Sequence, residues 1–254
     1  MGRDEREAVR ENFLGVEDGH IYFFYRPVKA SANDLRDVEQ LYIVMHPLVS
    51  KHYRLLSLET AKLPEPQTPF NLVTATVNKV DHKYQPILHE LDEKTVTVDG
   101  IATMGKGAAR PCGEGVYSLI PGENGMHLFY VVEYSGNDHQ IVTQLGIGDD
   151  GEFLIGVYNP YYGTDIEDPD PDVRPRFPES LKSALGNERI VFKDVHLLLD
   201  YEEARVGLFR EARESKPEEI RPIKEKMSTA DIFSDLRLSR EQYPVEPLIK
   251  GKWR

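Results

Sequence analysis

The chain has 254 residues, of which 40% are hydrophobic, and its 31 basic and 43 acidic side chains give a formal net charge of −12 at pH 7. This length can bury one sizeable core or two smaller ones, so it excludes neither arrangement. The apolar runs are only a few residues long, far below the roughly 20 that cross a bilayer, and the polar opening of the chain differs from a signal peptide. We therefore expect no membrane partner.

The charge is unevenly distributed along the chain. Residues 213–254 contain ten basic and eight acidic side chains, whereas residues 1–212 contain 21 basic and 35 acidic ones. Because proteins bind phosphate backbones through clustered Lys and Arg, this acidic surface predicts that nucleic acid is not a partner. The single cysteine, Cys112, cannot form an internal disulfide, which is typical of a reducing compartment and predicts a cytoplasmic protein.

Short runs rich in Val, Ile, Tyr, Phe and Thr, bounded by Gly, Pro, Asn or Asp, predict strands along most of the chain. After a polar helix at 3–13, we expect strands at 20–26, 40–46, 53–60, 70–79, 94–101, 115–120, 126–134, 140–147, 152–158, 189–193 and 204–210. Further helices are expected at 34–39, 85–93 and 178–187, with a short one near 228–236 capped by Ser228 or Thr229. The balance predicts a mainly β fold with few peripheral helices, and α+β as the alternative.

Two aromatic runs, GHIYFFYRP at 19–27 and GMHLFYVVEYS at 125–135, carry large side chains on both faces and predict central strands buried on both sides. Each run also begins one of two segments, 17–60 and 123–159, whose similar order of strand-like runs predicts an internal duplication. Most strands are built from the same few residue types, so chance explains the likeness equally well. Under duplication we expect two related antiparallel halves packed as a sandwich or a pseudo-twofold sheet. The matching pairs are 17–26 with 123–133, 38–43 with 142–147, and 53–59 with 153–159.

The predicted organisation is a polar helix at 1–16, one β-rich domain over 17–212, and a charged, proline-containing extension over 213–254. The extension either wraps over its own domain or folds on a partner as a linear segment. Its candidate interaction residues are the apolar side chains Ile232, Phe233, Leu236 and Trp253.

The acidic stretch DPDPDVRPRFPE at 168–179 has the carboxylate spacing of a calcium-binding loop. Those candidate ligands are Asp168, Asp170, Asp172 and Glu179. Val173 stands where such a loop needs glycine, and the prolines favour a stiff connector with solvated carboxylates. We therefore predict no metal at this stretch.

The candidate catalytic residues are His20, His127, Glu114 and Asp165. His20 and His127 occupy equivalent positions in the proposed repeat, and a facing pair would bind a metal or act as acid and base near neutral pH. Hydrogen bonds from both histidines to the backbone are the alternative. The chain contains no HExxH, GxSxG or CxxC motif and no GxGxxG motif after a first strand, so no cofactor is predicted.

Four motifs occur together in this chain: GHIYFFYRP, GEGVYSLI, YNP before a proline-rich connector, and LLLDYEEARVGLF at 197–209. In this combination the chain resembles a bacterial family of uncharacterised proteins over about residues 17–212. The resemblance implies a self-contained domain, and it carries no activity, cofactor or catalytic residue.

The missing catalytic motifs favour a binding or interaction module for an unknown protein or small molecule, and whether the chain is an enzyme stays open. The alternative is a hydrolase or isomerase whose site is assembled from dispersed His, Glu and Asp residues. A structural homodimer is a third alternative.

Overall fold

The computed structural model describes residues 15–29, 32–64, 71–98, 101–162, 174–210 and 229–253. The predicted helix at 3–13 and the candidate residues Asp165, Asp168, Asp170 and Asp172 lie outside this description.

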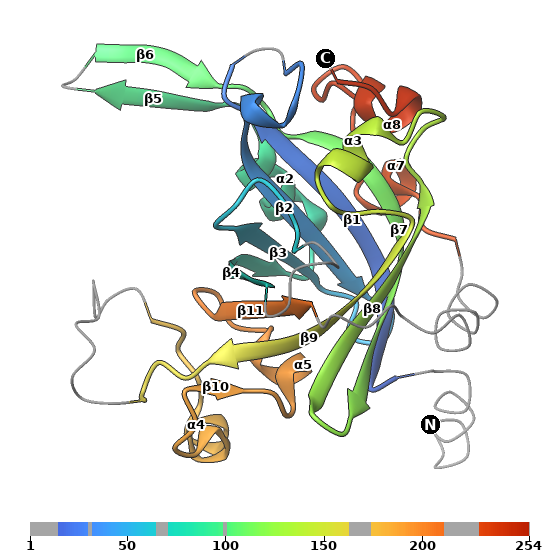
Figure 1. Ribbon diagram of the computed structural model, residues 1–254. Coiled ribbons are helices and arrows are strands. Elements are labelled where there is room, and N and C mark those ends of the chain that lie inside the picture. Colours follow the sequence, from blue (N-terminus) through green and yellow to red (C-terminus); the bar gives the residue numbers. More distant parts are fainter. Residues whose placement is uncertain are drawn as a thin grey trace.

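The fold is a closed antiparallel barrel of eight strands (Figure 1). The strands follow the order β9-β11-β4-β3-β2-β1-β7-β8, and β8 pairs with β9 to close the barrel. A short ninth strand, β10, pairs with β9. The bounds are β1 Glu17–Pro27, β2 Val38–Pro47, β3 Tyr53–Leu58, β4 Asn71–Asp81, β7 Arg110–Gly122, β8 Gly125–Tyr134, β9 Asp150–Tyr158, β10 Ile190–Val191 and β11 Arg205–Arg210.

The remaining elements surround the barrel. Strands β5 (Lys94–Val98) and β6 (Ile101–Lys106) form a separate hairpin that projects from one end (Figure 1). The helices in the described part of the chain are η1 Leu35–Asp37, α2 Tyr84–Leu91, α3 Gln140–Gln144, α4 Glu179–Leu185, α5 Val195–Leu198, α7 Ile232–Asp235 and α8 Glu246–Lys250.

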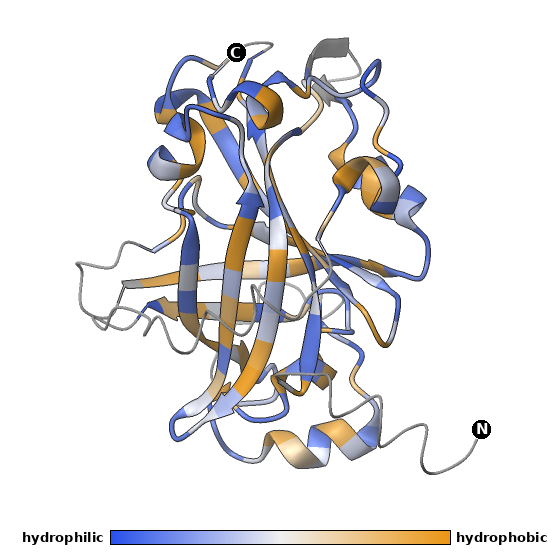
Figure 2. Ribbon diagram, turned by 90° about the vertical axis from the view of Figure 1, so that its right-hand side faces the viewer, coloured by the Kyte–Doolittle hydropathy of each residue, from blue (hydrophilic) through white to orange (hydrophobic). Residues whose placement is uncertain are grey.

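Side chains fill the barrel interior, as an eight-stranded barrel allows. Phe23 packs against Tyr130 with ring centroids 5.4 Å apart, and Tyr130 stacks on Phe153 at 6.0 Å. Hydrophobic and hydrophilic residues alternate along the strands, because successive side chains point to opposite faces of the sheet (Figure 2). The interior is therefore a packed core of aromatic and aliphatic side chains.

The outer face of β1, β2 and β3 is buried as well. Tyr22 and Phe24 point outward and have no exposed surface, because α2 and the C-terminal segment, residues 229–253, cover this wall. The prediction that the first aromatic run is buried on both faces is confirmed. The covering residues of the C-terminal segment are Ala230, Ile232, Leu236, Leu238, Tyr243, Val245 and Leu248.

The predicted mainly β class is confirmed, but the sandwich arrangement is wrong because the pairing of β8 with β9 closes one sheet on itself. Inward and outward residues alternate in a sandwich and in a barrel alike, so the pattern does not separate the two.

The strand predicted at 140–147 is also wrong, because this stretch forms α3 and the turn that follows it. Its buried residues Ile141, Val142 and Leu145 fit one face of a helix as well as they fit a strand. The middle pair of the proposed duplication therefore joins a strand, β2, to a helix, while the other two pairs join strands. The duplication itself stays a prediction.

Two local predictions are corrected. The single strand predicted at 94–101 is the first half of the β5–β6 hairpin. Helix α7 is capped by Asp231, whose side chain accepts hydrogen bonds from the amides of Phe233 and Ser234, and not by Thr229, while Ser228 lies outside the described residues. Aspartate is among the strongest N-cap residues, so the cap lies two residues later than expected.

Candidate functional site

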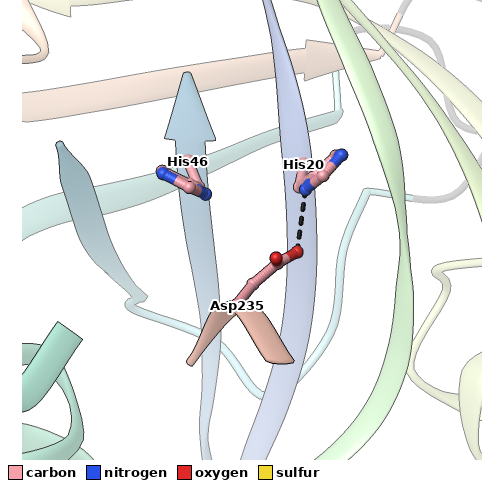
Figure 3. Close-up of side chains that lie close together, drawn as sticks. All are labelled: His20, His46 and Asp235. Carbon is pink, nitrogen blue, oxygen red and sulfur yellow. Dashed lines mark hydrogen bonds and ion pairs between the residues drawn. The ribbon is translucent and has the colours of Figure 1, made fainter. Parts of the chain in front are cut away.

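A cluster of two histidines and one aspartate lies on the outer wall of the barrel, beneath α7 (Figure 3). His20 on β1 and His46 on β2 are paired residues of an antiparallel ladder, so their side chains leave the same face. Asp235, the last residue of α7, approaches them from outside the barrel. Each residue offers one ligand atom, and the three atoms lie within 4.8 Å of one another.

Local structure positions Asp235. The Asp231 cap starts α7, and Ile232 and Leu236, both without exposed surface, anchor the helix in the apolar layer over β1–β3. The hydroxyl of Tyr53 on β3 donates to the backbone carbonyl of Asp235 at 2.9 Å. Asp235 is therefore held by its own backbone as well as by its side chain.

The carboxylate of Asp235 is a shared acceptor. Its Oδ2 lies 2.8 Å from Nδ1 of His20, and it also accepts a hydrogen bond from the hydroxyl of Tyr22. Burial raises the pKa of Asp235, but the hydrogen bonds from His20 and Tyr22 outweigh burial and hold this pKa below its ordinary value. The carboxylate is therefore ionised at neutral pH and His20 Nδ1 carries the shared proton.

His46 is the member of the cluster with an unused polar atom. Its ring stacks on Tyr53, with centroids 4.1 Å apart and an interplanar angle of 15°. Its Nδ1 is buried, and no described residue forms a hydrogen bond with it. Burial lowers the pKa of His46, against the opposing effect of Asp235, so the imidazole is neutral at pH 7. His196 Nδ1 is likewise buried without a hydrogen-bond partner among the described residues, so His46 Nδ1 points to a ligand only together with the nearby donor atoms of His20 and Asp235.

Glu114 lies beside the cluster, at the other end of α7. It is the paired residue of Tyr22 across β1 and β7, and its Oε2 accepts a hydrogen bond from the backbone amide of Ile232 at 2.7 Å. Burial raises the pKa of Glu114 to about 7. Glu114 therefore holds the start of α7, while Asp235 fixes its end.

The structure brings together some of the predicted residues and separates others. His20 and Glu114 both contact α7, but His127 lies on β8 and pairs with Glu152 at 3.0 Å. His20 faces His46 instead of His127, so the two histidines of the proposed repeat do not form a pair. Glu179 is exposed at the start of α4, where it pairs with Lys182 at 2.7 Å.

The predicted interaction residues contact the chain's own barrel. Ile232 and Leu236 are fully buried, and Phe233 packs partly against the same apolar layer. Trp253 meets Tyr25 edge-on, with ring centroids 5.2 Å apart. In this structure residues 229–253 of the extension pack against the barrel.

Sequence reasoning missed His46, Asp235, Tyr22 and Tyr53. His20 and Tyr22 share one face of a predicted strand, but the pairing with His46 depends on the register of β1 and β2. Asp235 lies 215 residues from His20 and has no local signal.

Comparison of the chain with protein-family models, with curated proteins and with solved structures gives no match. The resemblance to a bacterial family therefore stays a prediction, and the site is argued from its own geometry. No helix of the described residues is long and apolar enough to cross a membrane.

Proposed function

We propose that this protein is a binding module for a divalent transition-metal ion, with zinc as the best-suited ion, at His20, His46 and Asp235. The carrying observation is the convergence of three donor atoms within 4.8 Å, from three separate elements, around an imidazole whose Nδ1 has no hydrogen-bond partner in the described chain. We call these three residues the metal centre.

The donor types favour transition metals. Neutral imidazole suits zinc, copper, iron and nickel, whereas calcium and magnesium prefer sites built from oxygen ligands alone. The low pKa of Asp235 and the lowered pKa of His46 keep a carboxylate and a neutral imidazole ready near pH 7. Binding at His20 Nδ1 would displace the proton shared with Asp235, and the other ring nitrogen of His20 can carry that proton.

The surrounding tyrosines provide the support that metal ligands need. Tyr22 donates to the carboxylate of Asp235, and Tyr53 both stacks on His46 and donates to the Asp235 carbonyl. Such outer partners orient ligands and commonly change metal affinity by about 10- to 100-fold. The centre therefore has ligands and a supporting shell.

The test is calorimetric titration of the full-length protein with zinc chloride. We expect one zinc per chain. The variant His46→Phe keeps a ring against Tyr53 and removes the donor, so it should weaken binding by roughly 100-fold, at least as much as loss of a supporting residue. The matched control is His89→Phe, because His89 is exposed on α2. Equal zinc binding by the wild type and His46→Phe would refute the proposal.

A hydrolase is the second candidate function. Three protein ligands leave a coordination position for water, as in catalytic zinc sites, and the Asp235 side chain is 24% exposed. Zinc-dependent hydrolysis of an activated ester by the wild type, absent from His46→Phe, would favour it. Equal rates in both proteins would remove it.

A further inference from the structure

The metal centre takes ligands from two parts of the molecule. His20 and His46 belong to barrel strands, whereas Asp235 belongs to the C-terminal segment. We propose that a metal ion at this centre fastens the C-terminal segment to the barrel, so that metal occupancy controls exposure of the outer wall of β1–β3. This inference rests on the proposed function and adds regulation to it.

Helix α7 needs the barrel to hold it in place. It has only four residues, and so short a helix has little stability of its own. Its polar contacts with the barrel gather at its two ends, where Ile232 donates to Glu114 and Asp235 binds His20. The position of α7 therefore depends on contacts that a metal ion would strengthen.

The surface beneath α7 is strongly apolar. Tyr22, Phe24 and Val44 have no exposed surface, and Leu55 is 1% exposed, because α2 and the C-terminal segment cover them. Displacement of α7 would expose part of this wall as a contiguous patch, which is the kind of surface that proteins use to bind partners. Fastening α7 therefore keeps this apolar wall covered.

Linkage makes the coupling quantitative. Asp235 can serve as a ligand only when α7 lies on the barrel, so the full centre exists only in the docked form. An ion at about ten times its dissociation constant then lowers the undocked population by about tenfold. By the same linkage, the undocked form binds the metal more weakly than the docked form.

The far end of the C-terminal segment has an anchor of its own. Trp253 packs against Tyr25, and its indole nitrogen donates to Gln144 at 3.0 Å. None of these residues contributes to the metal centre. We therefore expect the metal to act on α7 and to leave α8 nearly unchanged, which provides an internal control.

The test is amide hydrogen exchange in the full-length protein, without metal and with zinc at about ten times its dissociation constant. The reporting amides are those of Ile232, Asp235 and Leu236, each of which donates a hydrogen bond in the docked form. We expect zinc to slow their exchange by about tenfold, while the α8 amides of Ile249 and Gly251 change little.

The variant His46→Phe should lose the zinc effect, and His89→Phe should retain it. If one zinc binds at the centre but the α7 amides exchange at the same rate, the fastening is refuted and the proposed function stands. If zinc does not bind, both fall. Slowing of α7 and α8 alike would also contradict the inference, because it would indicate general stabilisation.

Discussion

Two buried polar side chains of this protein, Arg54 and His46, differ in how completely they are paired. Inside one end of the barrel, the Arg54 side chain is 1% exposed and binds Glu17 through two hydrogen bonds of 2.5 and 2.8 Å. It also donates to Asp200 at 2.7 Å and to the carbonyl of His196 at 3.1 Å. On the outer wall, by contrast, His46 Nδ1 has no partner among the described residues.

The difference separates a structural cluster from a candidate binding site. Burial lowers the pKa of Arg54, but Glu17 and the other partners outweigh burial and raise it above its ordinary value, so the guanidinium is charged. Its donors meet carboxylates and a carbonyl, which leaves no role for a ligand. The outer cluster has convergent donors, partial exposure and one unsatisfied nitrogen, which are the features of a site that takes an ion.

The largest expected effect on stability comes from removing the Arg54 side chain from its buried ion pairs. Arg54→Ala leaves the carboxylates of Glu17 and Asp200 without their buried partner, and we expect a loss of about 3–5 kcal/mol in the free energy of unfolding. Urea denaturation measures it. The control, Arg36→Ala, breaks an exposed pair with Asp34 and should leave the free energy of unfolding nearly unchanged. Similar losses in both variants would contradict the assignment of Arg54.

The second prediction concerns the pH dependence of α7 docking through Glu114, which lies near Asp231, Glu133 and Asp235. Its pKa rises to about 7 in the folded protein, above the ordinary value of 4.5, so its contribution to stability is full below pH 4.5 and is lost as the pH rises through 7. Glu114→Gln keeps an acceptor for the Ile232 amide and removes the charge.

We therefore expect the wild type to lose about 2 kcal/mol relative to Glu114→Gln between pH 5 and pH 8. Urea denaturation of both proteins at the two pH values measures the difference. A constant difference across this range would show that Glu114 does not titrate there.

A smaller effect is expected at the edge of the metal centre. Tyr53→Phe keeps the stacking on His46 and removes the hydrogen bond to the Asp235 carbonyl. We expect a loss of about 1 kcal/mol in stability and about tenfold in zinc affinity. Tyr42→Phe, on the neighbouring strand and away from the centre, is the control for zinc affinity, and an equal change in both variants would contradict the supporting role of Tyr53.

Much of the strand content follows from the sequence, because alternation and β-branched residues mark strands locally. The closure of the barrel does not follow, because it depends on the pairing of β8 with β9, and a sandwich has the same alternation. The stretch at 140–147 was ambiguous for a related reason, since a short apolar run fits a strand and a helix alike.

The sequence allows only part of the candidate site to be predicted. His20 and Glu114 are polar residues in strand-like runs of the sequence, and both contact α7. Asp235 reaches His20 across 215 residues, through a chain path that no local pattern reveals. The apolar residues of the extension were visible, but whether they cover their own barrel or a partner depends on tertiary packing.

The most direct test of the metal centre is anomalous diffraction from crystals of the full-length protein soaked with zinc. The account predicts one strong zinc peak between His20, His46 and Asp235, about 2.0–2.2 Å from a ligand atom of each. An ordered α7 with no peak at this position, or zinc bound only elsewhere on the surface, would contradict it.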